Sequence, residues 1–140
     1  MSRRLSLIVL VFAIAAGAGF WVFKAHRTET TLKTSPVVGF EILKGRWLRA
    51  DGGYILEVRS ASPEGKLDAF YFNPKSIHVA KAEASMQGAA LKVFVELRDV
   101  NYPGSTYSLT YDASSDRLMG NYFQAALRQT FDVVFERAAP

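Results

Sequence analysis

Cysteine is missing from the 140-residue sequence, and histidine is nearly missing, with two residues at positions 26 and 78. The absence of cysteine excludes disulfide bonds, thiolate nucleophiles and cysteine-bound zinc. The histidines lack the HExxH spacing of a metal site, and the G-x-S-x-G motif that positions a serine nucleophile is also absent. The sequence therefore indicates no catalytic residue, no metal site and no cofactor, and it leaves enzymatic activity open without residues to assign to it.

An excess of charge of either sign is missing from most of the chain. The formal net charge is +4, but it comes from the first 36 residues, which contain five Lys or Arg residues and one Glu. Residues 37–140 contain twelve Lys or Arg and twelve Asp or Glu. Because a nucleic-acid-binding domain needs a basic surface of its own, the sequence argues against a nucleic-acid partner.

One long hydrophobic run is present near the N-terminus, at residues 5–23, behind two arginines. As an α-helix this run would be about 28 Å long, close to the roughly 30 Å thickness of a bilayer core. Trp21 beside Lys24 is typical of the membrane interface, which favours an uncleaved transmembrane anchor. The alternative is a secretory signal peptide, for which the small-residue stretches 13–15 and 16–18 provide cleavage sites.

Both interpretations of this run place the rest of the chain outside the cytoplasm. In the first, residues 1–24 are a single-pass anchor that binds the cell membrane through the hydrophobic run. In the second, the chain is periplasmic or secreted after cleavage. In either case residues 25–36 are polar and rich in threonine, which predicts a linker, and residues 37–140 are expected to form one folded domain.

Residues 37–140 alternate between apolar and polar positions and are interrupted by turn residues every 8–12 positions. No helical period of useful length is present, and short strands with short connections predict an antiparallel all-β fold. Eight such strands are enough to close an up-and-down barrel filled by side chains or holding one small ligand. A β-sandwich is the alternative. The strands are predicted at residues 45–50, 54–59, 67–72, 76–83, 91–98, 106–111, 117–123 and 130–137.

The ends of the domain carry a pair of residues found in a known barrel superfamily. Gly45-x-Trp47 opens the first predicted strand, and Arg137 shares the face of Phe135 in the last. The pattern resembles that of the calycins, which include lipocalins and avidins; there a late arginine packs over the tryptophan of the first strand. The resemblance implies that Arg137 covers Trp47 and ties the barrel closed. It covers scattered positions only and implies no ligand.

Aromatic residues are plentiful, at 13% of the chain, and three tyrosines have core-facing parity: Tyr54, Tyr107 and Tyr111. Most aromatic side chains are expected to fill the core. Hydroxyl groups of these three could instead orient a small hydrophobic or amphiphilic ligand inside the barrel or at its mouth. The first functional hypothesis is therefore a small-ligand-binding module.

A polar stretch between two predicted strands adds further candidates at one end of the barrel. Residues 102–105, Tyr-Pro-Gly-Ser, are predicted to form a type II turn, with proline at its second position and glycine at its third. The turn itself does not require Asp99, Asn101 and Tyr102 together. These three residues are therefore candidates for the lip of a ligand site.

Phe94 is the exception on a face that otherwise looks solvated, since it alternates with Lys92 and Glu96. An exposed aromatic residue of this kind can mark a protein contact. The second functional hypothesis is therefore a protein-interaction or structural subunit of the envelope, with a filled barrel core and an envelope protein as its partner.

Overall fold

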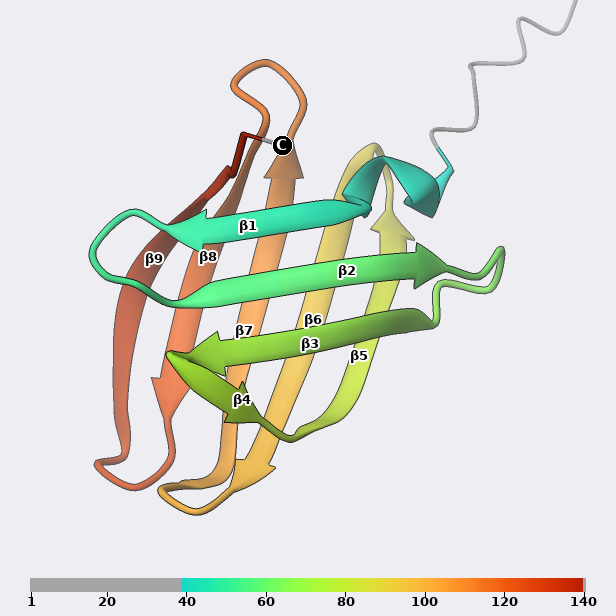
Figure 1. The fold of residues 1–140 in the computed structure, drawn as a ribbon. Helices are drawn as coiled ribbons and strands as arrows, with labels where there is room; N and C mark the ends of the chain where they lie inside the picture. The colour runs from blue at the N-terminus through green and yellow to red at the C-terminus, as the bar shows by residue number, and fades with distance from the viewer. Residues whose placement is uncertain (1–38, 140) are drawn as a thin grey trace, which may run out of the picture. The chain divides into compact units, whose positions relative to one another are not determined.

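The computed structural model describes residues 39–139 (Figure 1). The predicted anchor or signal peptide and the predicted linker lie outside these residues. Within the described part of the chain, none of the helical segments has the length and apolar character needed to cross a membrane. The one helical element there is a short 3-10 helix, η1 (Phe40–Leu43), that leads into the first strand.

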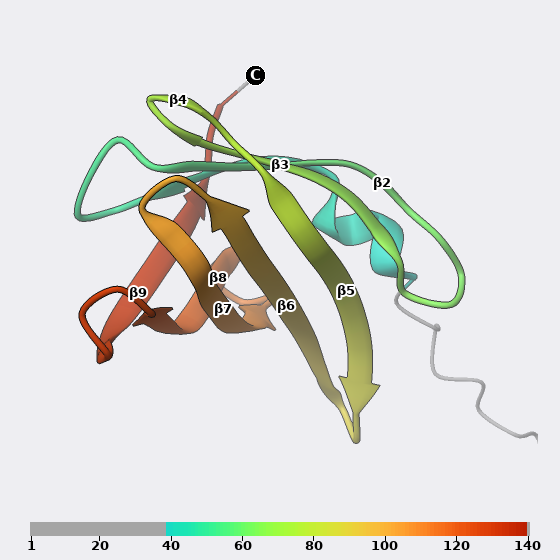
Figure 2. The same cartoon turned by 90° about the horizontal axis from the view of Figure 1, so that it is seen from below.

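All nine described strands form a single antiparallel sheet in the order β4-β3-β2-β1-β9-β8-β7-β6-β5. Figure 1 shows β1, β2 and β3 lying across β6, β7 and β8 at a steep angle, and Figure 2 shows the same two layers from below. The strands are β1 (Gly45–Arg49), β2 (Ile55–Ala61), β3 (Leu67–Asn73), β4 (Lys75–Ile77), β5 (Val79–Gln87), β6 (Ala90–Asp99), β7 (Tyr102–Asp112), β8 (Arg117–Gln124) and β9 (Gln129–Arg137).

The prediction of eight strands is wrong by one, because the strand predicted at residues 76–83 is two strands separated at His78. The part before His78 pairs with β3, and the part after it pairs with β6. The backbone of His78 is held at this point: its N–H donates to the Asp99 carboxylate at 2.8 Å, and its carbonyl accepts the Arg98 N–H at 3.1 Å. The chain thus crosses here from one edge of the sheet to the other.

The barrel is nearly closed. Pairing of β1 with β9 makes the sheet continuous from β4 to β5, and the two edges approach each other through a Lys66–Glu83 bridge. Beside this bridge the Ala84 N–H donates to the Gly65 carbonyl at 2.7 Å. A Cβ on Gly65 would lie 2.0 Å from the Ala84 carbonyl oxygen. Glycine is therefore needed where the edges meet.

Alternation along the strands produces the core, as predicted. In β6 the four apolar residues Leu91, Val93, Val95 and Leu97 are buried, and the residues between them are half-buried on the other face. The interior is filled mainly by aromatic and aliphatic side chains. The fully buried residues with the largest side chains are Trp47, Tyr71, Tyr107, Phe135, Leu43, Leu56, Leu97, Leu109 and Leu118.

The predicted contact of Trp47 with Arg137 is confirmed. The guanidinium carbon lies 4.1 Å from the centroid of the indole ring, and the two residues are cross-strand partners in the β1–β9 pair. Arg137 also donates to the carbonyls of Ile42 and Lys44, at 2.8 and 2.7 Å. The indole N–H donates to the Leu43 carbonyl at 2.9 Å, so η1 is fixed to this end of the barrel.

The turn predicted at residues 102–105 is displaced toward the N-terminus. Asp99 pairs with Tyr102, which leaves Val100 and Asn101 as the connection between β6 and β7. Asn101 has a φ of 68°, a conformation that asparagine tolerates better than most residues. Gly104 has a φ of 93° and lies where the register shifts, so it forms a bulge inside β7 rather than a turn.

Candidate functional site

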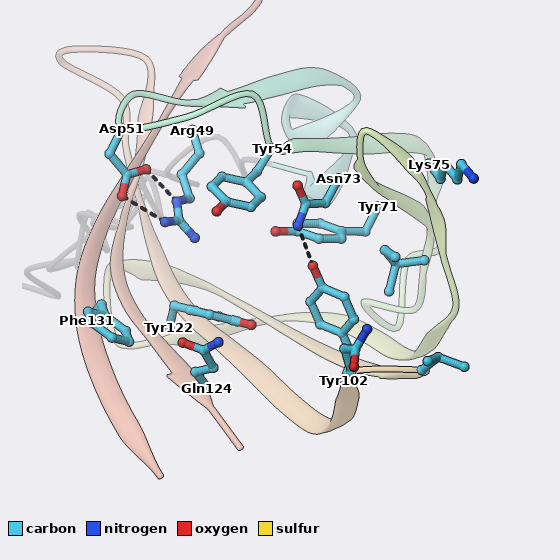
Figure 3. Close-up of a pocket in the computed structure, with 13 residues that line it drawn as sticks. Arg49, Asp51, Tyr54, Tyr71, Asn73, Lys75, Tyr102, Tyr122, Gln124 and Phe131 are labelled. Atoms are coloured by element: carbon cyan, nitrogen blue, oxygen red, sulfur yellow. Dashed lines mark hydrogen bonds and ion pairs between the residues drawn. The ribbon is translucent and has the colours of Figure 1, made fainter. Parts of the chain in front are cut away.

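A cavity of about 570 Å³ lies at one end of the barrel. Its walls come from the β1–β2, β3–β4 and β6–β7 connections and from the facing ends of β8 and β9 (Figure 3). The volume is within the range of small-molecule sites. The lining residues are Arg49, Asp51, Tyr54, Tyr71, Asn73, Lys75, Ile77, Val100, Asn101, Tyr102, Tyr122, Gln124 and Phe131.

The floor of the cavity is built around Arg49, which is 8% exposed at the end of β1. Its Nε and Nη2 donate to the two carboxylate oxygens of Asp51 at 2.5 and 2.7 Å. The guanidinium carbon lies 4.1 Å from the ring centroid of Tyr54 and 5.6 Å from that of Tyr122. The charge is thus held in place by one carboxylate and two aromatic rings, in a geometry that stabilises a partly desolvated cation.

Burial by itself lowers the pKa of Arg49, but the hydrogen bonds with Asp51 and Tyr107 outweigh it, and the net shift is upward. The same hydrogen bond to Arg49 lowers the pKa of the Asp51 carboxyl. Both groups are therefore charged at neutral pH. The pair forms a fixed ionic element in the floor rather than an acid and a base that exchange protons.

A chain of hydrogen bonds runs from this ion pair into the barrel. Arg49 Nη1 donates to the Tyr107 hydroxyl at 3.0 Å, and the Tyr107 and Tyr71 hydroxyls are 2.7 Å apart. Both tyrosines are buried, but only Tyr71 lines the cavity. Desolvation raises the pKa of both phenols, that of Tyr107 to about 12, so both are protonated at neutral pH.

The rim opposite Arg49 is formed by the β6–β7 turn. Tyr102 accepts a hydrogen bond from Asn73 Nδ2 at 2.6 Å, which joins this turn to the end of β3. Asn101 and Val100 also line the cavity, and Val100 is 79% exposed. Phe131 of β9 lines the cavity on the side away from Tyr102 and is 42% exposed (Figure 3). The cavity therefore has a polar floor and a partly apolar rim.

The structure places three of the six predicted ligand residues, Tyr54, Asn101 and Tyr102, in the cavity lining. Tyr107 lies beneath the floor, where its hydroxyl bonds to Arg49 and Tyr71. Asp99 is not in the lining; its carboxylate accepts the N–H groups of His78 and Val100, which lowers its pKa and fixes the turn.

Two other predicted residues lie away from this cavity. Tyr111 is near the opposite end of β7, where it donates to Asp116 at 3.0 Å and contacts Trp47 edge-on. Burial raises the pKa of Tyr111. Phe94 is half-buried on the outer face of β6, with Lys81 Nζ 5.6 Å from its ring centroid.

Sequence reasoning missed the residues at the centre of the floor: Arg49, Asp51 and Tyr71. A signal for Arg49 was present, because it has the same parity in β1 as the buried Trp47. A charged residue on a core-facing position is costly to bury unless it is paired, and Asp51 two residues later is the obvious partner. Tyr71 carried no such signal, since an inward-facing tyrosine is usually a core residue.

No family model, no curated protein and no solved structure matched the chain when it was compared with known proteins. Across residues 39–139 no group of three His, Cys, Asp or Glu side chains is arranged to hold a metal ion. The class of protein that the fold defines is therefore an antiparallel, nearly closed β-barrel with a cavity at one end.

Proposed function

We propose that this protein is an envelope β-barrel that binds a small amphiphilic ligand in the cavity at its open end. The observation that carries the proposal is the buried Arg49 in the cavity floor, surrounded by tyrosine rings. Burying an arginine is unfavourable. A ligand that contacts Arg49 in the cavity of about 570 Å³ would account for a buried arginine at this position. The ligand sits at the mouth, because the interior beneath is filled by side chains such as Tyr107 and Phe135.

The contact of Arg137 with Trp47 supports a calycin-like relationship, and it lies toward the end of the barrel away from the cavity. The hydrophobic run at residues 5–23 supports anchoring in the cell membrane, with a cleaved signal peptide as the alternative. In both cases the barrel works outside the cytoplasm.

Native mass spectrometry of the full-length chain, purified from the cells that make it, tests this proposal. We expect a retained small molecule in the wild type. Phe131→Ala, in the cavity rim, is expected to lose it, whereas Phe123→Ala is expected to keep it. These residues are a matched pair: their exposed fractions are 42% and 38%, and only Phe131 is in the lining.

The filled core favours a second candidate function, a structural or protein-interacting subunit that carries no small molecule. Trp47, Tyr107 and Phe135 are completely buried and occupy the space that a ligand would need inside the barrel. A spectrum that contains only the ligand-free chain supports this candidate and refutes the first. Equal retention in the Phe131→Ala and Phe123→Ala variants also refutes a ligand at the mouth.

A further inference from the structure

The direction of the hydrogen bonds beneath the cavity follows from their chemistry. Arginine donates and cannot accept, so the Tyr107 oxygen is the acceptor of the bond from Arg49. Tyr107 is completely buried, and its own proton has one partner among the described residues, the Tyr71 oxygen. If Tyr71 donated to Tyr107 instead, a buried hydroxyl proton would be left unpaired, at a cost of about 1–3 kcal/mol. Tyr107 therefore donates to Tyr71.

The proton of Tyr71 is consequently available to the cavity. Figure 3 shows the Tyr71 hydroxyl and the Arg49 guanidinium facing the space between Tyr54 and Tyr122. Because Tyr107 already receives a bond from a cation, it is a better donor to Tyr71, and Tyr71 in turn becomes a better donor to a third group.

Two more side chains carry open donor groups. A guanidinium has five N–H groups, and those of Arg49 that bond to Asp51 and Tyr107 account for three. Within residues 39–139 the remaining two have no protein acceptor. The Tyr102 oxygen accepts from Asn73 Nδ2, so its own proton is also free to donate. The floor and the adjoining rim thus present donors from three side chains.

The charges around the cavity agree with this polarity. The charged residues in the lining are Arg49, Asp51 and Lys75, which give a net charge of +1, but Figure 3 shows the Lys75 side chain directed away from the cavity. Each oxygen of the single carboxylate in the lining, Asp51, accepts a hydrogen bond from Arg49, so the two charges of this pair neutralise each other. The one carboxylate in the lining is thus already paired with a cation, whereas the open N–H and O–H groups are donors that suit the lone pairs of an anion.

We propose that Arg49, Tyr71 and Tyr102 form a donor site for the carboxylate of a small planar organic acid. The inference rests on the proposed function and names the chemical class of its ligand. The rings of Tyr54 and Tyr122 beside the guanidinium provide flat walls for a planar body, and Phe131 provides an apolar rim. The acid head lies on the floor, and the apolar body lies toward the opening.

Three probes of the same ring but different charge test this inference: benzoate, benzamide and benzylamine. Each is titrated into the full-length chain in a mild detergent, and NMR shifts of the cavity residues report binding. We expect benzoate to bind at least about tenfold more tightly than the other two, which corresponds to about 1.4 kcal/mol. Tyr71→Phe keeps the ring and removes one donor, so it should weaken benzoate about tenfold and leave benzamide less affected.

Two further variants keep the test decisive if Tyr71→Phe disturbs the core. Tyr102→Phe removes a donor at the rim, away from the buried chain, and should also weaken benzoate selectively. Tyr111→Phe is the matched control, since this tyrosine lies near the other end of the barrel, and it should leave all three affinities unchanged.

The outcomes separate this inference from the proposed function. If benzamide or benzylamine binds as tightly as benzoate, the cavity is a ligand site but the donor-site inference is wrong. If Tyr71→Phe and Tyr102→Phe both retain wild-type preference for benzoate, the assignment of these hydroxyls is overturned. If none of the three probes shifts the cavity residues, the donor-site inference is overturned, whereas the proposed small-ligand function is still decided by the native mass spectrum.

Discussion

Replacing Arg137 by alanine should destabilise the domain by about 3 kcal/mol. The side chain donates to two backbone carbonyls, of Ile42 and Lys44, and bonds to charged groups are typically worth about 1.5–3 kcal/mol each. Its side chain is 28% exposed, so water can replace part of this, leaving about 1 kcal/mol for each. The contact with Trp47, at 4.1 Å, adds about 1 kcal/mol. The bidentate pair with Asp116, at 2.6 and 2.9 Å, is partly exposed and screened by water, and it adds less than about 1 kcal/mol.

This loss is measurable by thermal unfolding of the full-length chain in a mild detergent, followed by circular dichroism. At roughly 5 °C per kcal/mol for a domain of this size, the Tm should fall by about 15 °C. Arg137→Lys keeps the charge but not the planar fork, so it should recover less than half of the loss.

Arg59→Ala is the matched control for this prediction. The guanidinium carbon of Arg59 lies 3.8 Å from the ring centroid of Phe70, and the side chain pairs with Glu57 at 2.8 Å. Arg59 therefore shares with Arg137 a cation–π contact and an ion pair. Its side chain is 54% exposed, and the expected loss is below about 1 kcal/mol. If Arg137→Ala costs no more than Arg59→Ala, the carbonyl bonds do not stabilise the barrel end and the reasoning is refuted.

Two further predictions concern the closure of the barrel and its tyrosines. In urea unfolding, Gly88→Ala should destabilise the domain by about 1–2 kcal/mol, because Gly88 has a φ of 61° and open space around it. Gly65→Ala should destabilise it by more than about 3 kcal/mol, because the added Cβ also meets the Ala84 carbonyl. Equal losses would contradict the role given to Gly65 in closing the barrel. Since burial raises the pKa of Tyr107 from 10.0 to about 12, the folded state holds this proton more tightly, and the resulting stability is complete below pH 10.0 and lost as the pH rises toward 12. Unfolding free energies should therefore fall by about 1.4 kcal/mol from this tyrosine alone near pH 11, and an unchanged value there would show that Tyr107 is not buried as a neutral phenol.

The location of most strands along the chain could be predicted from the sequence, because the two-residue period is a local property. An inward-facing apolar residue at every second position places Leu91, Val93, Val95 and Leu97 in the core whichever strands lie beside them. The contact of Trp47 with Arg137 was implied by the resemblance to calycins, and the pairing of the first strand with the last brings the two residues together.

Other features depended on contacts between distant segments. The split of one predicted strand at His78 requires the carboxylate of Asp99, twenty-one residues later, to hold the turn. The displaced β6–β7 turn follows from the register of the whole strand pair, in which Gly104 forms a bulge.

The sequence by itself determined an antiparallel all-β domain with a buried aromatic core, because alternation and turn residues act over a few neighbours. Only the tertiary structure decided where the cavity lies and which polar groups face it. Arg49, Tyr71 and Tyr102 come from β1, β3 and β7 and are brought together by the meeting of strand ends. Neither their proximity nor the direction of the hydrogen bonds between Arg49, Tyr107 and Tyr71 is encoded in any local pattern, because both depend on burial and on partners far away in the chain.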